Sequence, residues 1–181
     1  SIAQTYSTIL EVQELKLDEL LRNSLSSDIE NITKILNDSF GFIIVKPIDG
    51  LNIFEQAVVP WIMAQLIGDT IGQNYDNDKI YIVNDLGGKM EDGHRYSRTN
   101  QGGSVHTDGV NIKDPFNYFL LHIISEGLYG GESIIVNGLT IYNYLRKNIP
   151  EVISILNRNI LWEYKGVKEG RFYKEPIVKL V

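Results

Sequence analysis

The sequence predicts an α+β fold in which N-terminal helices precede a β-sandwich or jelly-roll core with helical insertions. The first part of the chain carries apolar residues at helical spacing, whereas the remainder contains short β-branched runs separated by glycine-containing turns. The 181 residues contain no repeat and no linker rich in proline and glycine. We therefore expect one domain that covers residues 1–181.

The expected helices follow apolar residues that recur every three or four positions. They cover residues 9–37, 53–68, 139–147 and 150–157. Ser27 and Glu30 have the spacing of a capping box, which predicts that a second helix opens within the first of these ranges. Pro60 predicts a kink or a boundary, and Pro150 fits the first turn of the last helix.

The expected strands are short runs rich in β-branched and aromatic residues. They cover residues 40–45, 79–83, 116–124, 132–136, 159–164 and 172–181. Polar, glycine-containing loops are expected at residues 69–78 and 86–103. A loop as long as the second one, inside a compact domain, is usually either functional or disordered.

The composition narrows the class of protein. Hydrophobic residues make up 43% and charged residues 22%, the net charge is −6, and no basic block occurs, so neither nucleic acid nor a membrane surface is expected as a partner. Cysteine is absent, which excludes disulfides and thiolate metal ligands. No apolar run reaches membrane-spanning length and no signal sequence is recognisable, so we expect a cytoplasmic protein.

The most informative stretch runs from Gln101 to Asn111 and contains His106 and Asp108. On an extended strand, residues two positions apart point to the same side, so the imidazole and the carboxylate would converge. With a second histidine they would form the facial triad of non-haem Fe(II) oxygenases. Neighbouring glycines at 102, 103 and 109 leave room around such a site.

Two other interpretations of this stretch remain open. Asp108 and Gly109 also fit a plain turn, with His106 as a half-buried strand residue of an unrelated β-sandwich. A zinc hydrolase is a further alternative, although no HExxH motif or other cluster of histidine ligands supports it.

From about residue 10 to residue 181 the chain resembles the taurine dioxygenase-like (TauD/TfdA) family of Fe(II)/2-oxoglutarate-dependent oxygenases. The resemblance depends mainly on His106-Thr-Asp-Gly109 followed by Gly130-Gly-Glu-Ser133. The strand at Gly41–Val45 and the segment Ile149-Pro-Glu-Val152 match other family features in the same order.

The resemblance implies a double-stranded β-helix in which His106 and Asp108 bind Fe(II) and Ser133 contacts the cosubstrate 2-oxoglutarate. It implies a dioxygenase that uses O2 to hydroxylate or otherwise oxidise a small polar molecule, such as an amino acid or a natural-product intermediate, with release of succinate and CO2. Homo-oligomers occur in the family. We expect the loop before the metal motif to contact the substrate through Tyr96, Arg98, Asn100 and Gln101.

The chain departs from the family pattern after Ser133. The family places a third metal ligand, a histidine, and an arginine for 2-oxoglutarate further downstream, but no histidine follows Ser133 here. His94 and His122 are the alternative third ligands. We expect an N-terminal part of a longer enzyme, whose last expected strand runs to the final residue. The alternative is a non-catalytic small-molecule or metal-binding module on the same fold.

Overall fold

A computed structural model describes residues 2–74, 76–165, 168 and 170–179. The chain divides into two compact units. The first contains Ser1–Ile82 and Tyr118–Gly130, and the second contains Val83–Asn117 and Gly131–Val181. None of the described helices has both the length and the apolar character that a membrane crossing requires.

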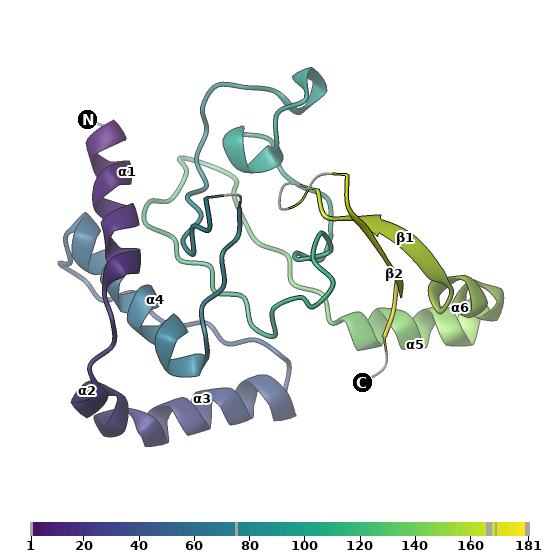
Figure 1. Cartoon of the computed structure of the whole chain (residues 1–181), viewed down its shortest axis with the longest axis horizontal. Helices are drawn as coiled ribbons and strands as arrows, with labels where there is room; N and C mark the ends of the chain where they lie inside the picture. The colour runs from purple at the N-terminus through teal and green to yellow at the C-terminus, as the bar shows by residue number, and fades with distance from the viewer. Residues whose placement is uncertain (1, 75, 166–167, 169, 180–181) are drawn as a thin grey trace. The chain divides into compact units, whose positions relative to one another are not determined.

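The first unit is helical. Its elements are α1 (Ile2–Glu11), the 3-10 helix η1 (Val12–Glu14), α2 (Glu19–Ser24), α3 (Ser26–Asp38) and α4 (Ile53–Ile67). Both α1 and α3 contact α4, as Figure 1 shows. The helical expectation for this part of the chain is confirmed, and so is the loop that follows α4.

The helix boundaries differ from those expected. Helix α3 begins after Leu25 without a side-chain cap, so the predicted capping box of Ser27 and Glu30 is wrong. A capping box opens α4 instead. The Asn52 carboxamide oxygen accepts the Glu55 N–H at 3.1 Å, and the Glu55 carboxylate accepts the Asn52 N–H at 2.9 Å. Pro60 lies inside α4 and does not end it.

The hydrophobic core of the first unit lies where α1 and η1 meet α4. Its buried residues are Ile9, Val12, Ala57 and Trp61. Val58, Ile80 and Ile82 pack against them. The indole N–H of Trp61 donates to the Leu15 carbonyl oxygen at 2.8 Å, so the buried ring keeps a hydrogen-bond partner.

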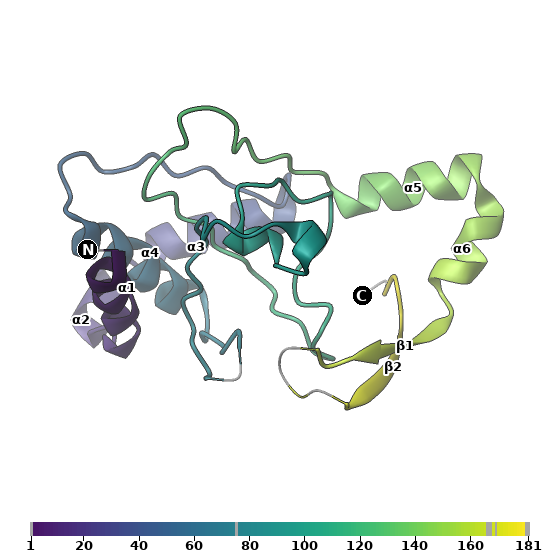
Figure 2. The ribbon, with the colours of Figure 1, turned by 90° about the horizontal axis from the view of Figure 1, so that it is seen from above.

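The second unit combines short helices with one β-hairpin. Its elements are η2 (Met90–Asp92), η3 (Tyr96–Arg98), α5 (Gly138–Asn148), α6 (Pro150–Leu156), β1 (Asn159–Glu163) and β2 (Phe172–Pro176). Asn137 caps α5 by accepting the Thr140 N–H, and Pro150 opens α6 as expected. Figure 2 shows α5 leading through α6 into β1. Strands β1 and β2 pair antiparallel, with Leu161 opposite Lys174.

The structure therefore confirms a mixture of helices and strands, but with less sheet than expected. The last two expected strands form in part, as β1 and β2; β2 ends at Pro176, residues 177–179 are not strand, and residues 180 and 181 lie outside the described part of the chain. Residues 40–45, 79–83, 116–124 and 132–136 are not strands, so these four predictions are wrong. A β-branched run favours an extended backbone, but a strand also requires a partner that supplies hydrogen bonds. Along these segments Ile44 and Ile134 remain 85% and 78% exposed.

Candidate metal site

The long loop before the metal motif is held by backbone hydrogen bonds within the second unit. The Asn84 N–H donates to the Ser97 carbonyl oxygen at 3.2 Å, and the Leu86 N–H donates to the Arg98 carbonyl oxygen at 3.0 Å. Ser97 and Thr99 are buried, with 7% and 8% of their surface exposed. These contacts hold the loop in a defined conformation, and its expected functional role stays a prediction.

The 3-10 helix η3 fixes the backbone at Tyr96. The backbone N–H and the hydroxyl of Thr99 both donate to the Tyr96 carbonyl oxygen, at 3.1 and 3.0 Å. The phenol of Tyr96 then reaches the imidazole of His106. Its oxygen lies 3.0 Å from His106 Nε2, and the two ring centroids are 5.3 Å apart.

The tautomer of His106 follows from its second contact. His106 Nδ1 lies 2.6 Å from the Ser104 carbonyl oxygen, which can only accept a hydrogen bond. Nδ1 therefore carries the proton, and in the neutral imidazole Nε2 presents its lone pair. This lone pair accepts the hydrogen bond from the Tyr96 hydroxyl. A neutral imidazole held by a carbonyl on one nitrogen is the form that ligates metals.

Asp108 reaches the same nitrogen of His106. Its Oδ1 lies 3.5 Å from Nε2, with 42% of the His106 side chain and 44% of the Asp108 side chain exposed. Two ligands bound about 2.1 Å from one ion, at angles of about 90–110°, lie about 3.0–3.4 Å apart. The observed 3.5 Å lies just beyond this range, so a small movement of either side chain would bring the two donors to the spacing of ligands on one ion. The predicted convergence of the two side chains occurs, although residues 106–108 form no strand.

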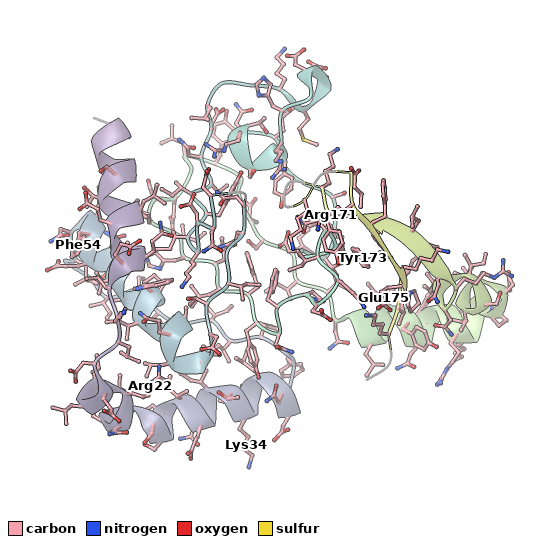
Figure 3. All side chains as sticks on the ribbon, viewed as in Figure 1. Arg22, Lys34, Phe54, Arg171, Tyr173 and Glu175 are labelled. Carbon is pink, nitrogen blue, oxygen red and sulfur yellow. The ribbon has the colours of Figure 1, made fainter. Side chains whose placement is uncertain are left out.

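The loop of residues 104–112, which carries His106 and Asp108, is called the metal loop below. Sequence reasoning missed the residues that hold it against the β-hairpin. The Tyr173 hydroxyl donates to the carbonyl oxygens of Val110 and Ile112. The Asn111 carboxamide donates to the Lys165 carbonyl oxygen at 3.0 Å. Figure 3 labels Tyr173 on β2. No sequence pattern predicts these contacts, because they join segments more than fifty residues apart.

The protonation state of Tyr173 favours this role. Burial, the neighbouring Tyr164 and the neighbouring Glu175 raise the pKa of Tyr173 above its ordinary value. A phenol with the ordinary pKa of 10.0 is already protonated at neutral pH, and the raised pKa extends further into alkali the range in which Tyr173 remains a donor.

Gly109 makes the sharp turn directly after Asp108. Its φ is +76°, in the left-handed region that favours glycine, and the Ile112 N–H donates back to its carbonyl oxygen at 3.1 Å. A Cβ at this position would lie 3.0 Å from a ring carbon of Phe116. The turn expected at Asp108-Gly109 is therefore present together with the converging ligands.

The four residues expected to contact the substrate make different contacts in the structure. Tyr96 contacts His106. The Gln101 carboxamide oxygen accepts the Met90 N–H at 2.6 Å, so it holds the loop together. Asn100 is exposed, and Arg98 is half-buried with its carbonyl oxygen bonded to the Leu86 N–H.

Ser133 lies in the same unit as the metal loop but outside any strand. It is exposed and makes no hydrogen bond within the described part of the chain. The preceding Gly130 and Gly131 have φ of +74° and +86°, as a glycine turn requires. The structure leaves the expected contact of Ser133 with 2-oxoglutarate as a prediction.

A third metal ligand is not evident. Among the described residues, no three histidine, cysteine, aspartate or glutamate side chains gather closely enough to share one ion. His94 is an exposed residue of the loop. His122 belongs to the first unit, where burial lowers its pKa and its Nε2 is buried without a described partner. Among the described residues, His106 and Asp108 thus remain as two candidate ligands.

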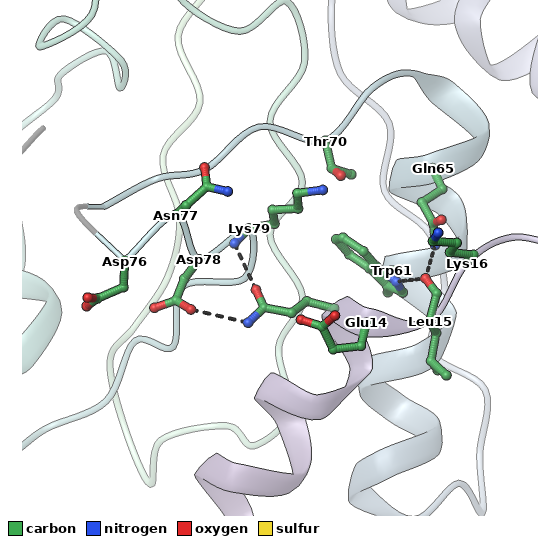
Figure 4. A pocket seen from close by; sticks show the side chains of 11 residues that line it. Glu14, Leu15, Lys16, Trp61, Gln65, Thr70, Asp76, Asn77, Asp78 and Lys79 are labelled. Carbon is green, nitrogen blue, oxygen red and sulfur yellow. Dashed lines mark hydrogen bonds between the residues drawn. The ribbon is translucent and has the colours of Figure 1, made fainter.

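A separate polar pocket lies in the first unit, between η1, α4 and the loop after α4 (Figure 4). Its volume is about 350 Å³. Gln13 spans one wall, where its amide donates to Asp78 and its carbonyl oxygen accepts the Lys79 N–H. None of the expected site residues lines this pocket.

Comparison with known proteins decides the family. The sequence pattern of the taurine catabolism dioxygenase TauD, TfdA family matches residues 4–180. The chain belongs to this family. Members of the TauD, TfdA family are Fe(II)/2-oxoglutarate dioxygenases.

One curated relative carries a name that does not mention taurine. FR-33289 synthase of Streptomyces rubellomurinus (strain ATCC 31215) is 25% identical over 135 residues, which are 72% of this chain and 38% of that protein. The chain therefore spans well under half the length of this relative. No solved structure matches the chain.

Proposed function

We propose that this chain carries the metal-binding part of an Fe(II)- and 2-oxoglutarate-dependent dioxygenase that oxidises a small polar molecule. The observation that supports it best is the convergence of His106 Nε2 and Asp108 Oδ1 at 3.5 Å in a chain that belongs to the TauD, TfdA family. For the whole protein we propose the double-stranded β-helix of the family, in which the unpaired extended segments would acquire partners.

The roles of the residues follow from their chemistry. His106 would hold iron through Nε2, because the Ser104 carbonyl oxygen keeps the proton on Nδ1. Asp108 would add a hard anionic ligand that suits Fe(II). The bound iron and 2-oxoglutarate would supply the activation of O2. The Ser133 hydroxyl would donate to a carboxylate oxygen of 2-oxoglutarate.

The proposed substrate is a small polar molecule, such as an amino acid or a natural-product intermediate. The name of the relative, FR-33289 synthase, supports a biosynthetic rather than a purely catabolic role. We place Arg98 and Asn100 among the substrate contacts, since Gln101 already binds a backbone N–H. We also propose that the protein acts in the cytoplasm.

The decisive test measures Fe(II) binding without oxygen by titration calorimetry, followed by 2-oxoglutarate consumption in the presence of O2. Asp108→Ala should weaken Fe(II) binding more than tenfold, because it removes one of the described ligands. Asp114→Ala is a matched control, since Asp114 is an exposed carboxylate of the same loop. Unchanged affinity in Asp108→Ala would remove Asp108 from the site.

A non-catalytic metal-binding module is the second candidate, because the described residues supply only two ligands. The same experiment separates the two functions. Fe(II) binding that depends on His106 and Asp108 but supports no 2-oxoglutarate consumption would favour the binding module.

A further inference from the structure

We propose that Tyr96 competes with the metal for His106, so that metal loading releases its phenol. This inference rests on the proposed metal site and assigns Tyr96 a gating role instead of a plain substrate contact. The relationship that points to it is the 3.0 Å hydrogen bond between the Tyr96 hydroxyl and His106 Nε2.

The competition follows from the single lone pair on Nε2. The Ser104 carbonyl oxygen holds the proton on Nδ1, which leaves Nε2 as the only ring nitrogen that can accept. In the neutral ring, Nε2 can accept from the Tyr96 hydroxyl, whose oxygen lies 3.0 Å away. A lone pair that binds a metal ion cannot also accept a hydrogen bond, so the metal must displace the phenol.

The placement of Tyr96 is built into the loop. Thr99, which is 8% exposed, donates two hydrogen bonds to the Tyr96 carbonyl oxygen. The backbone beneath the phenol is therefore held in place. A Cβ on Gly103 would lie 3.6 Å from both the Tyr96 and the His106 rings, so glycine there leaves space beside the pair.

The rings of Tyr96 and His106 are exposed enough to solvent for a metal ion to replace the phenol at Nε2. Tyr96 is 40% exposed, and the His106 and Asp108 side chains are exposed to a similar extent. An ion can reach the donor pair from solvent, and the phenol has room to leave. Once released, the phenol lies beside the metal site, where it can donate to a bound substrate only after metal has entered.

The test compares Fe(II) affinity under anaerobic conditions in the wild type and in Tyr96→Phe. Removing the hydroxyl removes the competing hydrogen bond. From the usual net free-energy contribution of one hydrogen bond, we expect Tyr96→Phe to bind Fe(II) about 2- to 10-fold more tightly. Tyr144→Phe is the control, because Tyr144 is an exposed tyrosine on α5 in the same unit. Equal or weaker binding by Tyr96→Phe would overturn the proposal, and weaker binding would make Tyr96 a ligand.

A second measurement follows Tyr96 in the wild-type protein, so its main readout does not depend on how Tyr96→Phe folds. In wild-type protein with ¹³C-labelled tyrosine rings, the Tyr96 resonance should shift when diamagnetic Zn(II) is added, and His106→Ala should abolish that shift. A Tyr96 resonance that stays in place while Zn(II) binds would overturn the proposal.

Failure of the inference is distinguishable from failure of the metal site. If wild-type protein binds neither Fe(II) nor Zn(II), the proposed function fails and the competition fails with it. If binding occurs and is lost in His106→Ala, yet Tyr96→Phe binds like the wild type, only the role of Tyr96 is wrong.

Discussion

The hydroxyl of Tyr173 donates a hydrogen bond to the carbonyl oxygen of Val110, a residue 63 positions earlier in the chain. Val110 is the residue after Gly109, and the turn at Gly109 directly follows the proposed ligand Asp108. A side chain of the C-terminal hairpin therefore holds the backbone of the metal loop. The geometry of the candidate site depends on this contact as well as on the metal motif itself.

Replacing Tyr173 by phenylalanine should loosen the metal loop. The change removes the donor to Val110 and Ile112 but keeps the ring against Tyr164. We expect a loss of about 1 kcal/mol in the free energy of unfolding, measured by urea denaturation, together with weaker Fe(II) binding. Tyr164→Phe is the control, and equal effects of the two changes would contradict a specific tether.

Gly109→Ala should destabilise the loop through both the backbone and the new methyl group. The left-handed φ of +76° costs an alanine about 1–2 kcal/mol, and the Cβ would crowd Phe116. Gly102→Ala is a matched control, because its Cβ would meet no atom within 4 Å. Thermal denaturation should show a clear drop for Gly109→Ala alone; similar melting temperatures would disprove the requirement for glycine.

Val12→Ala should show that the core between η1 and α4 stabilises the first unit. Val12 is 0% exposed, and removing its two methyl groups should cost about 2 kcal/mol in the free energy of unfolding. Val45→Ala removes the same atoms at a position that is 56% exposed and should cost much less. If chemical denaturation gives similar losses for both variants, Val12 does not belong to a stabilising core.

Asp78 should contribute stability that acid removes. The carboxamides of Asn74 and Gln13 donate to its carboxylate and hold its pKa below the ordinary value of 3.8. Because the folded pKa lies below the unfolded one, the contribution is complete above pH 3.8 and is lost as the pH falls through the folded pKa. The effect is small, since Asp78 is only half-buried.

The measurement is the urea midpoint of the wild type and of Asp78→Asn as the pH falls from about 6 to about 3. The advantage of the wild type should shrink toward the acid end. Asp76→Asn changes an exposed neighbour and should show no such trend. A wild-type advantage that does not vary with pH would contradict the role of the carboxylate.

Local signals predicted the helices and the hairpin well. Helices α4, α5 and α6 lie within one residue of their expected bounds, because hydrogen bonds between residues four apart and the apolar pattern are both readable locally. Asn52 and Glu55 share a similar sequence pattern with Ser27 and Glu30, yet of these two pairs the first forms a capping box and the second does not. Two equivalent local signals cannot be ranked without the packing around them.

By itself, the sequence determined the family, the helices and the meeting of His106 with Asp108, because each depends on residues close together in the chain or on an ordered set of motifs. Only the tertiary structure decided which extended segments are paired, that Tyr96 occupies Nε2 of His106, and that Tyr173 holds Val110. Strand pairing and these side-chain contacts depend on where distant or irregular segments meet in space. No periodicity or spacing encodes that meeting.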